Sequence, residues 1–409
     1  MSELIRPGLA WIEGDFQSGI EIEVEGEYIV DVRRTDRCPI EPEVAMLPGF
    51  VNAHSHAFQR GLRGRGEVFT NPADDFWSWR EAMYGLVETL TPEAVFAHSV
   101  RAYQEMRVAG ITSVGEFHYI HHSDQGLDFA LDKAVLSAAA EADIRIVLLY
   151  ACYLTGGFDV PISGAQHRFD GGDLKTWWKA FDRSENGCRG TKQSMGVVIH
   201  SLRAVPIDIA AELRAEAKAR GLVVHLHLEE QPAEIEACRA AHDCTPMRLV
   251  LDRLDPGPDM TAVHCTHTDP AEMTEYAATG AHVCLCPLTE ANLGDGIADV
   301  TGMQAANASI CLGTDSNARI SMIEEMRWCE YGQRLRAGRR GTCVDADGRI
   351  DRPLIDMATR AGAEALGLHA GVIARGSVAD FNRMDLTTPG LQGVAREHLA
   401  AAIITGSVG

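Results

Sequence analysis

Short apolar runs alternate with longer amphipathic stretches along most of this chain. Eight of these runs have the length and residue types of buried strands, and helical periodicity lies between them. The runs begin at Leu47, Ile111, Ile144, Gly196, Leu222, Thr261, His282 and Ile310. This alternation over roughly 300 residues predicts an α/β fold, a TIM-like (β/α)8 barrel. A doubly wound open sheet is the alternative, but no Gly-x-Gly-x-x-Gly motif follows an early run.

The two ends of the chain have a different pattern. Apolar and polar residues alternate from residue 1 to 46, with Gly26 between two segments, which predicts a small antiparallel β unit. The tail from about Gly376 also has the character of a strand. We therefore predict a small β-sandwich domain built from residues 1–46 and 371–409, and a barrel domain at 47–370.

Two segments of the predicted barrel exceed ordinary loop lengths, namely 57–91 and 150–195. We expect both to form structured insertions over the mouth of the barrel. The mouth is the rim at the C-terminal ends of the strands, and it holds the active site in barrels of this kind. Polar residues that end the apolar runs are therefore the candidates for chemistry.

Histidines and a carboxylate gather at this rim. His54 and His56 end the first run, and their imidazoles project together because alternate residues of a strand face the same side. His227 ends the fifth run, and Asp315 ends the eighth. Each histidine alone is more often a hydrogen-bonded core residue. Three imidazoles and a carboxylate together predict a site for Zn²⁺ or Fe²⁺.

Further residues near these ligands suit hydrolysis. Glu230 lies three residues after His227, where its carboxylate can exchange protons with a water on the metal without being a ligand. His264 closes the sixth run and can stabilise a developing negative charge, with His267 as its rival for that role. We expect Glu229 to be a solvated loop acid.

Composition narrows the possible partners. The net charge is −21, from 37 Lys and Arg against 58 Asp and Glu, which argues against nucleic acid and anionic membranes. No apolar run approaches the roughly 20 residues of a membrane span, and the N-terminal segment lacks the apolar core of a signal peptide. A cytoplasmic protein is expected.

The eleven cysteines show no paired spacing, and several lie within apolar runs, where cysteine behaves as a small hydrophobic residue. The pair Cys284-Leu-Cys286 could suggest zinc, but no second cysteine pair accompanies it. A reduced compartment is therefore expected.

The rim pattern resembles that of the amidohydrolase superfamily: His-x-His after strand 1, histidines on strands 5 and 6, and aspartate on strand 8. Over nearly the whole chain, the closer resemblance is to the formimidoylglutamate deiminase family of histidine degradation. Its motifs are His54-Ser-His-Ala-Phe-Gln-Arg60, Phe76-Trp-Ser-Trp-Arg80-Glu, Phe117-His-Tyr119-Ile-His-His122, His200-Ser-Leu-Arg203-Ala-Val, Leu288-Thr-Glu-Ala-Asn-Leu-Gly-Asp-Gly296 and Glu324-Glu-Met-Arg-Trp-Cys-Glu-Tyr331.

The resemblance implies hydrolytic deimination of N-formimino-L-glutamate to N-formyl-L-glutamate and ammonia. It gives Glu230 the role of proton shuttle, beside His264, and Asp315 or Glu230 that of proton acceptor. It assigns substrate binding to Gln59, Arg80, Tyr119, His200 and Arg203. Arg80 and Arg203 can each offer a bidentate fork to a carboxylate of the dicarboxylate substrate. A surface position on a helix is the alternative for Arg80.

Two-metal members of the superfamily bridge their ions with a carboxylated lysine after strand 4. Here that run ends in His200-Ser-Leu-Arg203 without lysine, which predicts one divalent ion, zinc first and iron second. The resemblance also suggests a homodimer, and related chains usually continue into further strands beyond the position of Gly409. The main rival function is another single-metal deaminase, acting on a guanine-like base or another formimino compound. A metal-free relative and an amide or lactam hydrolase are weaker alternatives.

Overall fold

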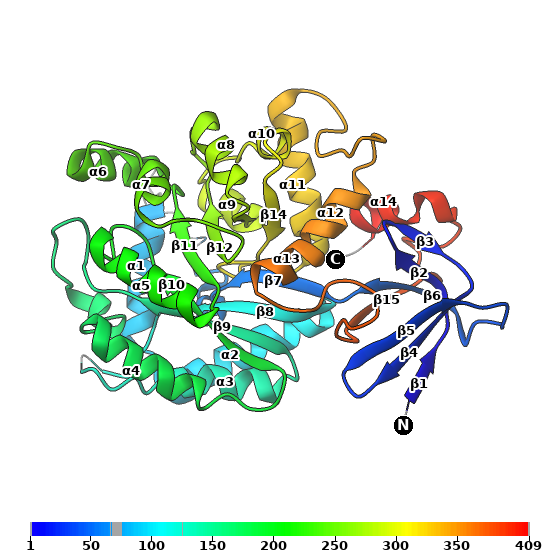
Figure 1. Ribbon diagram of the computed structural model, residues 1–409, viewed down its shortest axis with the longest axis horizontal. Helices are drawn as coiled ribbons and strands as arrows, with labels where there is room; N and C mark the ends of the chain where they lie inside the picture. Colours follow the sequence, from blue (N-terminus) through cyan, green and yellow to red (C-terminus); the bar gives the residue numbers. More distant parts are fainter. Residues whose placement is uncertain (1, 66, 68–75, 125, 408–409) are drawn as a thin grey trace.

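A barrel of eight parallel strands forms the centre of the molecule (Figure 1). The computed structural model describes residues 2–65, 67, 76–124 and 126–407. The barrel strands are β7 (Phe50–Ser55), β8 (Ile111–His118), β9 (Arg145–Cys152), β10 (Gln193–Ile199), β11 (Val224–Leu228), β12 (Met260–His264), β13 (His282–Leu285) and β14 (Ser309–Leu312). Each pairs in parallel with the next, and the eight predicted runs coincide with them. The predicted barrel is confirmed.

The barrel closes where the end of β14 meets β7. The N–H groups of Thr314 and Asp315 both donate to the carbonyl of His54 at 3.0 Å. Gly313 makes this approach possible, because a Cβ at that position would lie 2.7 Å from the Cβ of His54. The same closure brings Asp315 beside the histidines of β7.

Helices surround the barrel and follow from the local sequence. Thr91 caps α2 by accepting from the N–H of Ala94, and proline opens α2, α6, α7, α8 and α9, where its missing N–H costs nothing. The helices that follow the strands are α2 (Pro92–Val108), α3 (Asp132–Glu141), α4 (Leu174–Glu185), α5 (Ile207–Arg220), α6 (Pro232–His242), α7 (Pro246–Arg253), α8 (Pro270–Ala278), α9 (Pro287–Leu293), α10 (Val300–Ala305), α11 (Met322–Ala337), α12 (Asp351–Met357) and α13 (Arg360–Ala365).

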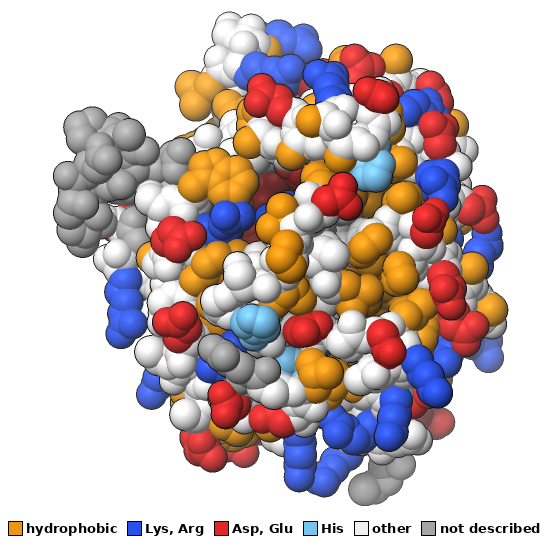
Figure 2. Space-filling view, turned by 90° about the vertical axis from the view of Figure 1, so that its left-hand side faces the viewer, with side chains coloured by type: hydrophobic (Ala, Val, Ile, Leu, Met, Phe, Trp, Pro, Cys, Tyr) orange, Lys and Arg blue, Asp and Glu red, His pale blue; other side chains and the backbone are white. Residues whose placement is uncertain are grey.

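Short helices in the two long segments cover the mouth, as expected. They are η1 (Ala57–Leu62), α1 (Phe76–Glu88) and η2 (Gly164–Arg168); side chains of η1 and α1, and Phe169 directly after η2, line the pocket at the rim. Figure 2 views this face, where hydrophobic side chains surround a hollow that contains charged ones. Part of the first segment, 68–75, lies outside the described residues.

Two small sheets lie beside the barrel, on the right in Figure 1. One contains β1 (Ser2–Ile5), β4 (Ile20–Glu25) and β5 (Tyr28–Arg34); the other contains β2 (Pro7–Ile12), β3 (Asp15–Gln17), β6 (Glu41–Pro48) and β15 (Phe381–Asp385). Ile22, Ile29, Met46 and Ile373 belong to one buried apolar cluster of this region. The predicted small β domain is confirmed. Its boundaries at 46 and 371 stay predictions, and β6 runs across the first.

The end of the chain differs from the expected strand. Only β15 is a strand there; the chain then continues into α14 (Arg396–Gly406), whose alanine-rich sequence favours helix. Leu399, Ile403 and Ile404 of α14 are buried, and the helix contacts α11, α12 and β3. The tail thus packs partly against the barrel. In the described part of the chain, none of the helices has the length and apolar character needed to cross a membrane.

Candidate active site

The four predicted metal ligands converge at the barrel rim. His54 Nε2 and His56 Nε2 each lie 3.3 Å from Asp315 Oδ1. His227 Nε2 lies 3.2 Å from His54 Nε2. Ligand atoms about 2.0–2.2 Å from a tetrahedral ion are separated from one another by roughly 3.3 Å, so these spacings suit a single ion.

The protonation of these groups also suits a metal ion. His56 Nδ1 donates to the carbonyl of Phe117 at 2.8 Å, so its Nε2 lone pair faces the other ligands. Burial lowers the pKa of His54 and His227, and lowers that of His56 to about 3, which keeps the imidazoles neutral. Burial alone would raise the pKa of Asp315, but the neighbouring histidines hold it well below its usual range. Three neutral imidazoles and a carboxylate fit a divalent ion.

Strained backbone marks the ends of three strands at this rim. Glu229, His264, Cys265 and Asp315 all have positive φ, of 54°, 76°, 51° and 43°. A left-handed conformation costs a residue with a side chain about 1–3 kcal/mol, and such residues cluster at functional sites. The strain therefore falls where the predicted catalytic residues lie.

His264 lies among three carboxylates. Its Nε2 is 3.8 Å from Glu230 Oε1 and 3.8 Å from Asp315 Oδ2, and its Nδ1 is 3.3 Å from Glu290 Oε1. Burial opposes a charge on this imidazole, but Glu230, Glu290 and Asp315 raise its pKa to about 10. Burial raises the pKa of Glu230. A cationic imidazole beside a carboxyl group that can hold a proton is suited to acid–base chemistry.

His267 and Glu229 lie away from this group. His267 Nε2 donates to the carbonyl of Asp295 at 2.8 Å, and His267 does not line the pocket at the rim, whereas His264 does. Glu229 is buried and accepts from the N–H of Met247 at 2.9 Å, so the expectation of a solvated loop acid was wrong. Its left-handed backbone turns the side chain inwards onto the start of α7.

The predicted substrate-binding residues all line the same pocket. Gln59 Nε2 donates to the hydroxyl of Tyr119 at 2.9 Å, and Gln59 Oε1 is buried without a partner. The ring of Tyr119 lies 5.2 Å from the ring of His200 and 5.1 Å from that of His56. Tyr119 and His200 therefore lie against the candidate metal ligands, and Gln59 contacts Tyr119.

The two arginines line the same pocket with Tyr84 and Tyr153. The guanidinium of Arg80 lies 4.4 Å from the ring centroid of Trp77, and its Nε is buried without a hydrogen-bond partner. Burial alone would lower the pKa of Arg203, but Tyr153 and nearby carboxylates raise it. Within the described residues, neither arginine forms an ion pair with a carboxylate. Both cations are available for an anion.

Several pocket residues were not predicted from the sequence. They are Trp79, Met83, Tyr84, Tyr153, Phe169 and Glu290. Most come from the two insertions or the segments beside them, where no strand periodicity indicates which side chains face the rim. The motif from Leu288 to Gly296 contains Glu290 and could have indicated that this residue matters. Its spacing, however, does not show that the Glu290 carboxylate faces His264.

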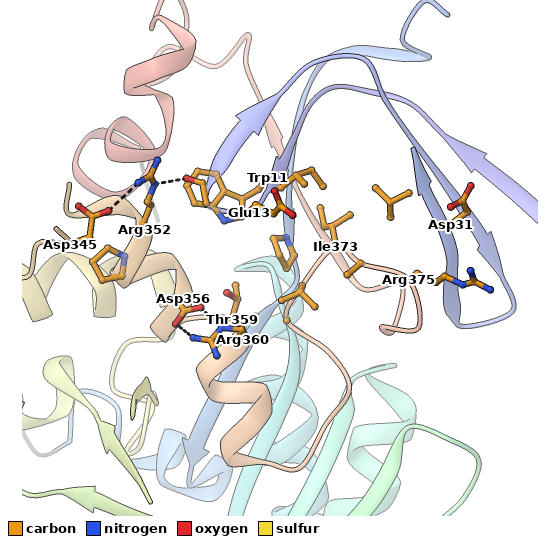
Figure 3. A pocket seen from close by; sticks show the side chains of 18 residues that line it. Trp11, Glu13, Asp31, Asp345, Arg352, Asp356, Thr359, Arg360, Ile373 and Arg375 are labelled. Carbon is orange, nitrogen blue, oxygen red and sulfur yellow. Dashed lines mark hydrogen bonds and ion pairs between the residues drawn. The ribbon is translucent and has the colours of Figure 1, made fainter. Parts of the chain in front are cut away.

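A larger cavity, of about 840 Å³, lies between the small sheets and α12 and α13 (Figure 3). Four of its charged residues form ion pairs: Arg352 lies 3.4 Å from Asp345, and Arg360 lies 2.6 Å from Asp356. Its described lining contains no histidine. The space at the rim is only about 60 Å³, yet the unpaired cations and the ligand set are there. Chemistry, and not volume, identifies the site.

The cysteine pair does not form a separate site. All eleven cysteines are free, and Cys286 joins His264 and Asp315 as a second group of possible ligands that shares Asp315. Burial raises the pKa of Cys284 and Cys286 well above its usual value, and it is the thiolate that binds metals. The three imidazoles with Asp315 fit an ion better.

Comparisons with known proteins agree with this geometry. The amidohydrolase family model matches residues 45–407. Formimidoylglutamate deiminase from Pseudomonas aeruginosa is 41% identical over 84% of this chain and 77% of its own length. 5-Methylthioadenosine/S-adenosylhomocysteine deaminase from Natronomonas pharaonis is 28% identical over 85% of this chain and 74% of its own.

Among solved structures, an amidohydrolase from Brucella melitensis is 32% identical and superimposes with a TM-score of 0.89, covering 98% of this chain and 91% of that one. An adenosine deaminase from Xanthomonas campestris with bound zinc is 24% identical, has a TM-score of 0.82, covers 99% of this chain and 89% of that one, and supports the fold. The chain belongs to the amidohydrolase family.

Proposed function

We propose that this chain hydrolyses N-formimino-L-glutamate to N-formyl-L-glutamate and ammonia in histidine degradation. The observation that carries the proposal is the pair Arg80 and Arg203, two cations without carboxylate partners among the described residues, in a pocket beside a four-ligand centre. In a chain with a net charge of −21, such local cations are needed to hold a dianion. The 41% identity to a formimidoylglutamate deiminase supports the same substrate.

The two groups of donors match the two carboxylates of this substrate. The formimino group is attached to the α-nitrogen, so the α-carboxylate lies close to the reacting carbon and the side-chain carboxylate lies farther away. Tyr119 and His200 contact the metal ligands, and Gln59 contacts Tyr119. They suit the α-carboxylate, and Arg80 with Arg203 suit the distal one.

Residues of the rim supply the proton transfers. A divalent ion held by His54, His56, His227 and Asp315 would lower the pKa of water toward about 7 and polarise the substrate. Asp315 or Glu230 accepts the proton of the attacking water as its oxygen bonds to the formimino carbon. Glu230 then delivers a proton to the departing nitrogen, Asp315 accepts the remaining proton of the added oxygen, the C–N bond breaks, and ammonia leaves as that oxygen becomes the formyl carbonyl. His264, 3.8 Å from both carboxylates, stabilises the developing negative charge.

Other features of the proposal go with this chemistry. We propose one ion per chain, with zinc preferred and iron as the alternative, because the same ligands suit both. We also propose a cytoplasmic homodimer. A second candidate function is deamination of a purine-like base, favoured by the 28% identity to 5-methylthioadenosine/S-adenosylhomocysteine deaminase. The two arginines favour the dicarboxylate over a neutral base.

An assay of ammonia release tests the proposal. N-formimino-L-glutamate should be hydrolysed fastest, ahead of N-formimino-L-aspartate, guanine and 5-methylthioadenosine. Glu230→Gln should retain its metal and lose about 10²–10⁴-fold in kcat, because it removes the proton shuttle. Glu236→Gln, the same change on the exposed side of α6, is the matched control and should keep full activity. Preference for a purine, or normal turnover by Glu230→Gln, would contradict the proposal.

A further inference from the structure

Gln166 contacts the hydroxyl of Tyr153, which lines the pocket, and two backbone groups fix the orientation of the Gln166 amide. The N–H of Ser163 donates to Gln166 Oε1 at 3.2 Å, and Gln166 Nε2 donates to the carbonyl of Gly156 at 3.3 Å. A backbone N–H can only donate and a carbonyl can only accept, so the amide oxygen and nitrogen cannot be exchanged. Gly156 permits this contact, because a Cβ there would lie 2.8 Å from Gln166 Oε1.

This orientation determines how the hydroxyl of Tyr153 is used. Gln166 Nε2 lies 2.9 Å from the Tyr153 oxygen and must donate to it. The Tyr153 oxygen is therefore an acceptor in this bond, and its own proton points elsewhere. Among the described residues that proton has no acceptor. Burial raises the pKa of Tyr153 to about 12, so the hydroxyl remains protonated at neutral pH.

The hydroxyl of Tyr153 lies in the part of the pocket that contains the arginines. Tyr153 is 3% exposed and lines the pocket together with Arg80 and Arg203. The charges of Arg203 and Arg80 both act on its hydroxyl, opposing the effect of burial. Its ring lies 4.8 Å from that of His200. Among the described residues, this hydroxyl proton has no acceptor and the two arginines form no ion pair, so an anionic oxygen of a ligand suits this position.

We propose that Tyr153 donates a third hydrogen bond to the distal carboxylate of the substrate, beside Arg80 and Arg203, and that Gln166 is the positioning residue that aims its proton. This inference rests on the proposed function. It makes Tyr153 a residue that selects for a carboxylate at the far end of the substrate. Gln166 does not touch the substrate and acts only by occupying the phenol oxygen.

Tyr153→Phe tests this directly, because it removes only the hydroxyl. We expect KM for N-formimino-L-glutamate to rise about tenfold to a hundredfold, the loss of one hydrogen bond to a charged group, while kcat changes less than about threefold. The formimino derivative of L-norvaline has the same chain without the distal carboxylate. With this compound, Tyr153→Phe and wild type should differ by less than about twofold in kcat/KM.

Gln166→Leu frees the Tyr153 proton to turn away and should raise KM about threefold, with kcat retained, so it tests the inference even if Tyr153→Phe folds poorly. Tyr276→Phe is the matched control. Tyr276 lies on α8, and its buried hydroxyl donates to the carbonyl of His282 at 3.2 Å, so removing it should leave KM unchanged.

An unchanged KM in Tyr153→Phe, or an equal loss of kcat/KM with the norvaline compound, would overturn the inference alone. No ammonia from N-formimino-L-glutamate with wild type would overturn the proposed function and the inference with it.

Discussion

Two buried clusters of histidines around one aspartate lie near the rim of the barrel, and they are built on different interactions. One is the candidate metal centre, with Asp315 at its middle. The other contains His118 at the end of β8, His121 in the loop that follows, and Asp132 at the start of α3. Both could hold a metal by residue type alone.

In the second cluster, a proton lies between each pair of contacting atoms. His118 Nε2 and His121 Nδ1 donate to Asp132 Oδ1 at 3.0 and 2.9 Å, and the hydroxyl of Tyr150 donates to Oδ2 at 2.7 Å. His121 Nε2 contacts the carbonyl of Ala151 at 2.8 Å. These are ordinary hydrogen-bond distances, and each of these ring nitrogens has an acceptor.

In the metal centre, the ligand atoms are farther apart and share one acceptor, because His54 Nε2 and His56 Nε2 both lie 3.3 Å from Asp315 Oδ1. The closest pair consists of two ring nitrogens, His54 Nε2 and His227 Nε2, at 3.2 Å. Two lone pairs at this distance repel unless a proton or a cation lies between them. The comparison teaches that residue type does not distinguish a metal site from a hydrogen-bonded cluster, whereas the partner of each nitrogen does.

The largest effect is expected for Asp315→Asn. The amide removes both a ligand and a proton acceptor, so we expect loss of bound metal and a fall in kcat of about 10³-fold or more. Metal analysis and the ammonia assay on the same sample check this. If Asp315→Asn kept its full metal content and activity, the ion would be bound by other residues. The Asp315 cluster would then no longer differ from the Asp132 cluster as a metal centre.

Removal of the metal should affect only one cluster. Chelation should abolish activity. It should also lower the free energy of unfolding by about 4 kcal/mol, compared with protein in the presence of free metal ion at a thousand times its Kd. Zinc should restore both at one ion per chain, measured by metal analysis and thermal unfolding. Two ions per chain, with the second lost in His118→Ala, would show that the hydrogen-bonded cluster also binds metal.

Asp132→Asn provides the reverse test. Its carboxylate is buried and bonded to two histidines and Tyr150, so the substitution should cost about 3 kcal/mol of stability, measured by denaturant unfolding. The metal content of the folded variant should remain that of wild type. A variant that unfolds normally but has lost its metal would make Asp132 part of the metal centre.

The sequence was sufficient for the barrel and for the metal centre for one physical reason. Both can be predicted from a regular pattern along the chain. The short apolar runs predict the strands, and the polar residues that end these runs are the predicted ligands. His54 lies in β7 and His56 follows directly after its end, so the two residues project together, and Asp315 joins them because the barrel closes at Gly313. These relations follow from topology alone.

The remaining site residues depend on backbone paths that no period describes. Tyr153 and Gln166 meet because η2 folds back over the end of β9, and Glu290 meets His264 from α9, the helix that follows β13. Glu229 was misassigned because a single left-handed residue reverses the direction of its side chain. The hydrogen-bonded cluster is a case of the same kind, because its aspartate lies on a helix beyond the rim.

The smallest expected effect is on the pH dependence of the second cluster. Burial alone would raise the pKa of Asp132, but the imidazoles of His121 and His118 hold it well below its usual range. A carboxyl group with a lowered folded-state pKa contributes stability that is fully present above its unfolded pKa, about 3.9, and is lost as the pH falls toward the folded value. The stability difference between wild type and Asp132→Asn should therefore be constant from pH 7 to about pH 5. By pH 3 this stability difference should narrow by roughly 1 kcal/mol, measured by urea unfolding at each pH.

A stability difference that stays constant down to pH 3 would mean that the Asp132 carboxylate is not held by charged or hydrogen-bonded imidazoles. The contrast with the metal centre would then lose its physical basis.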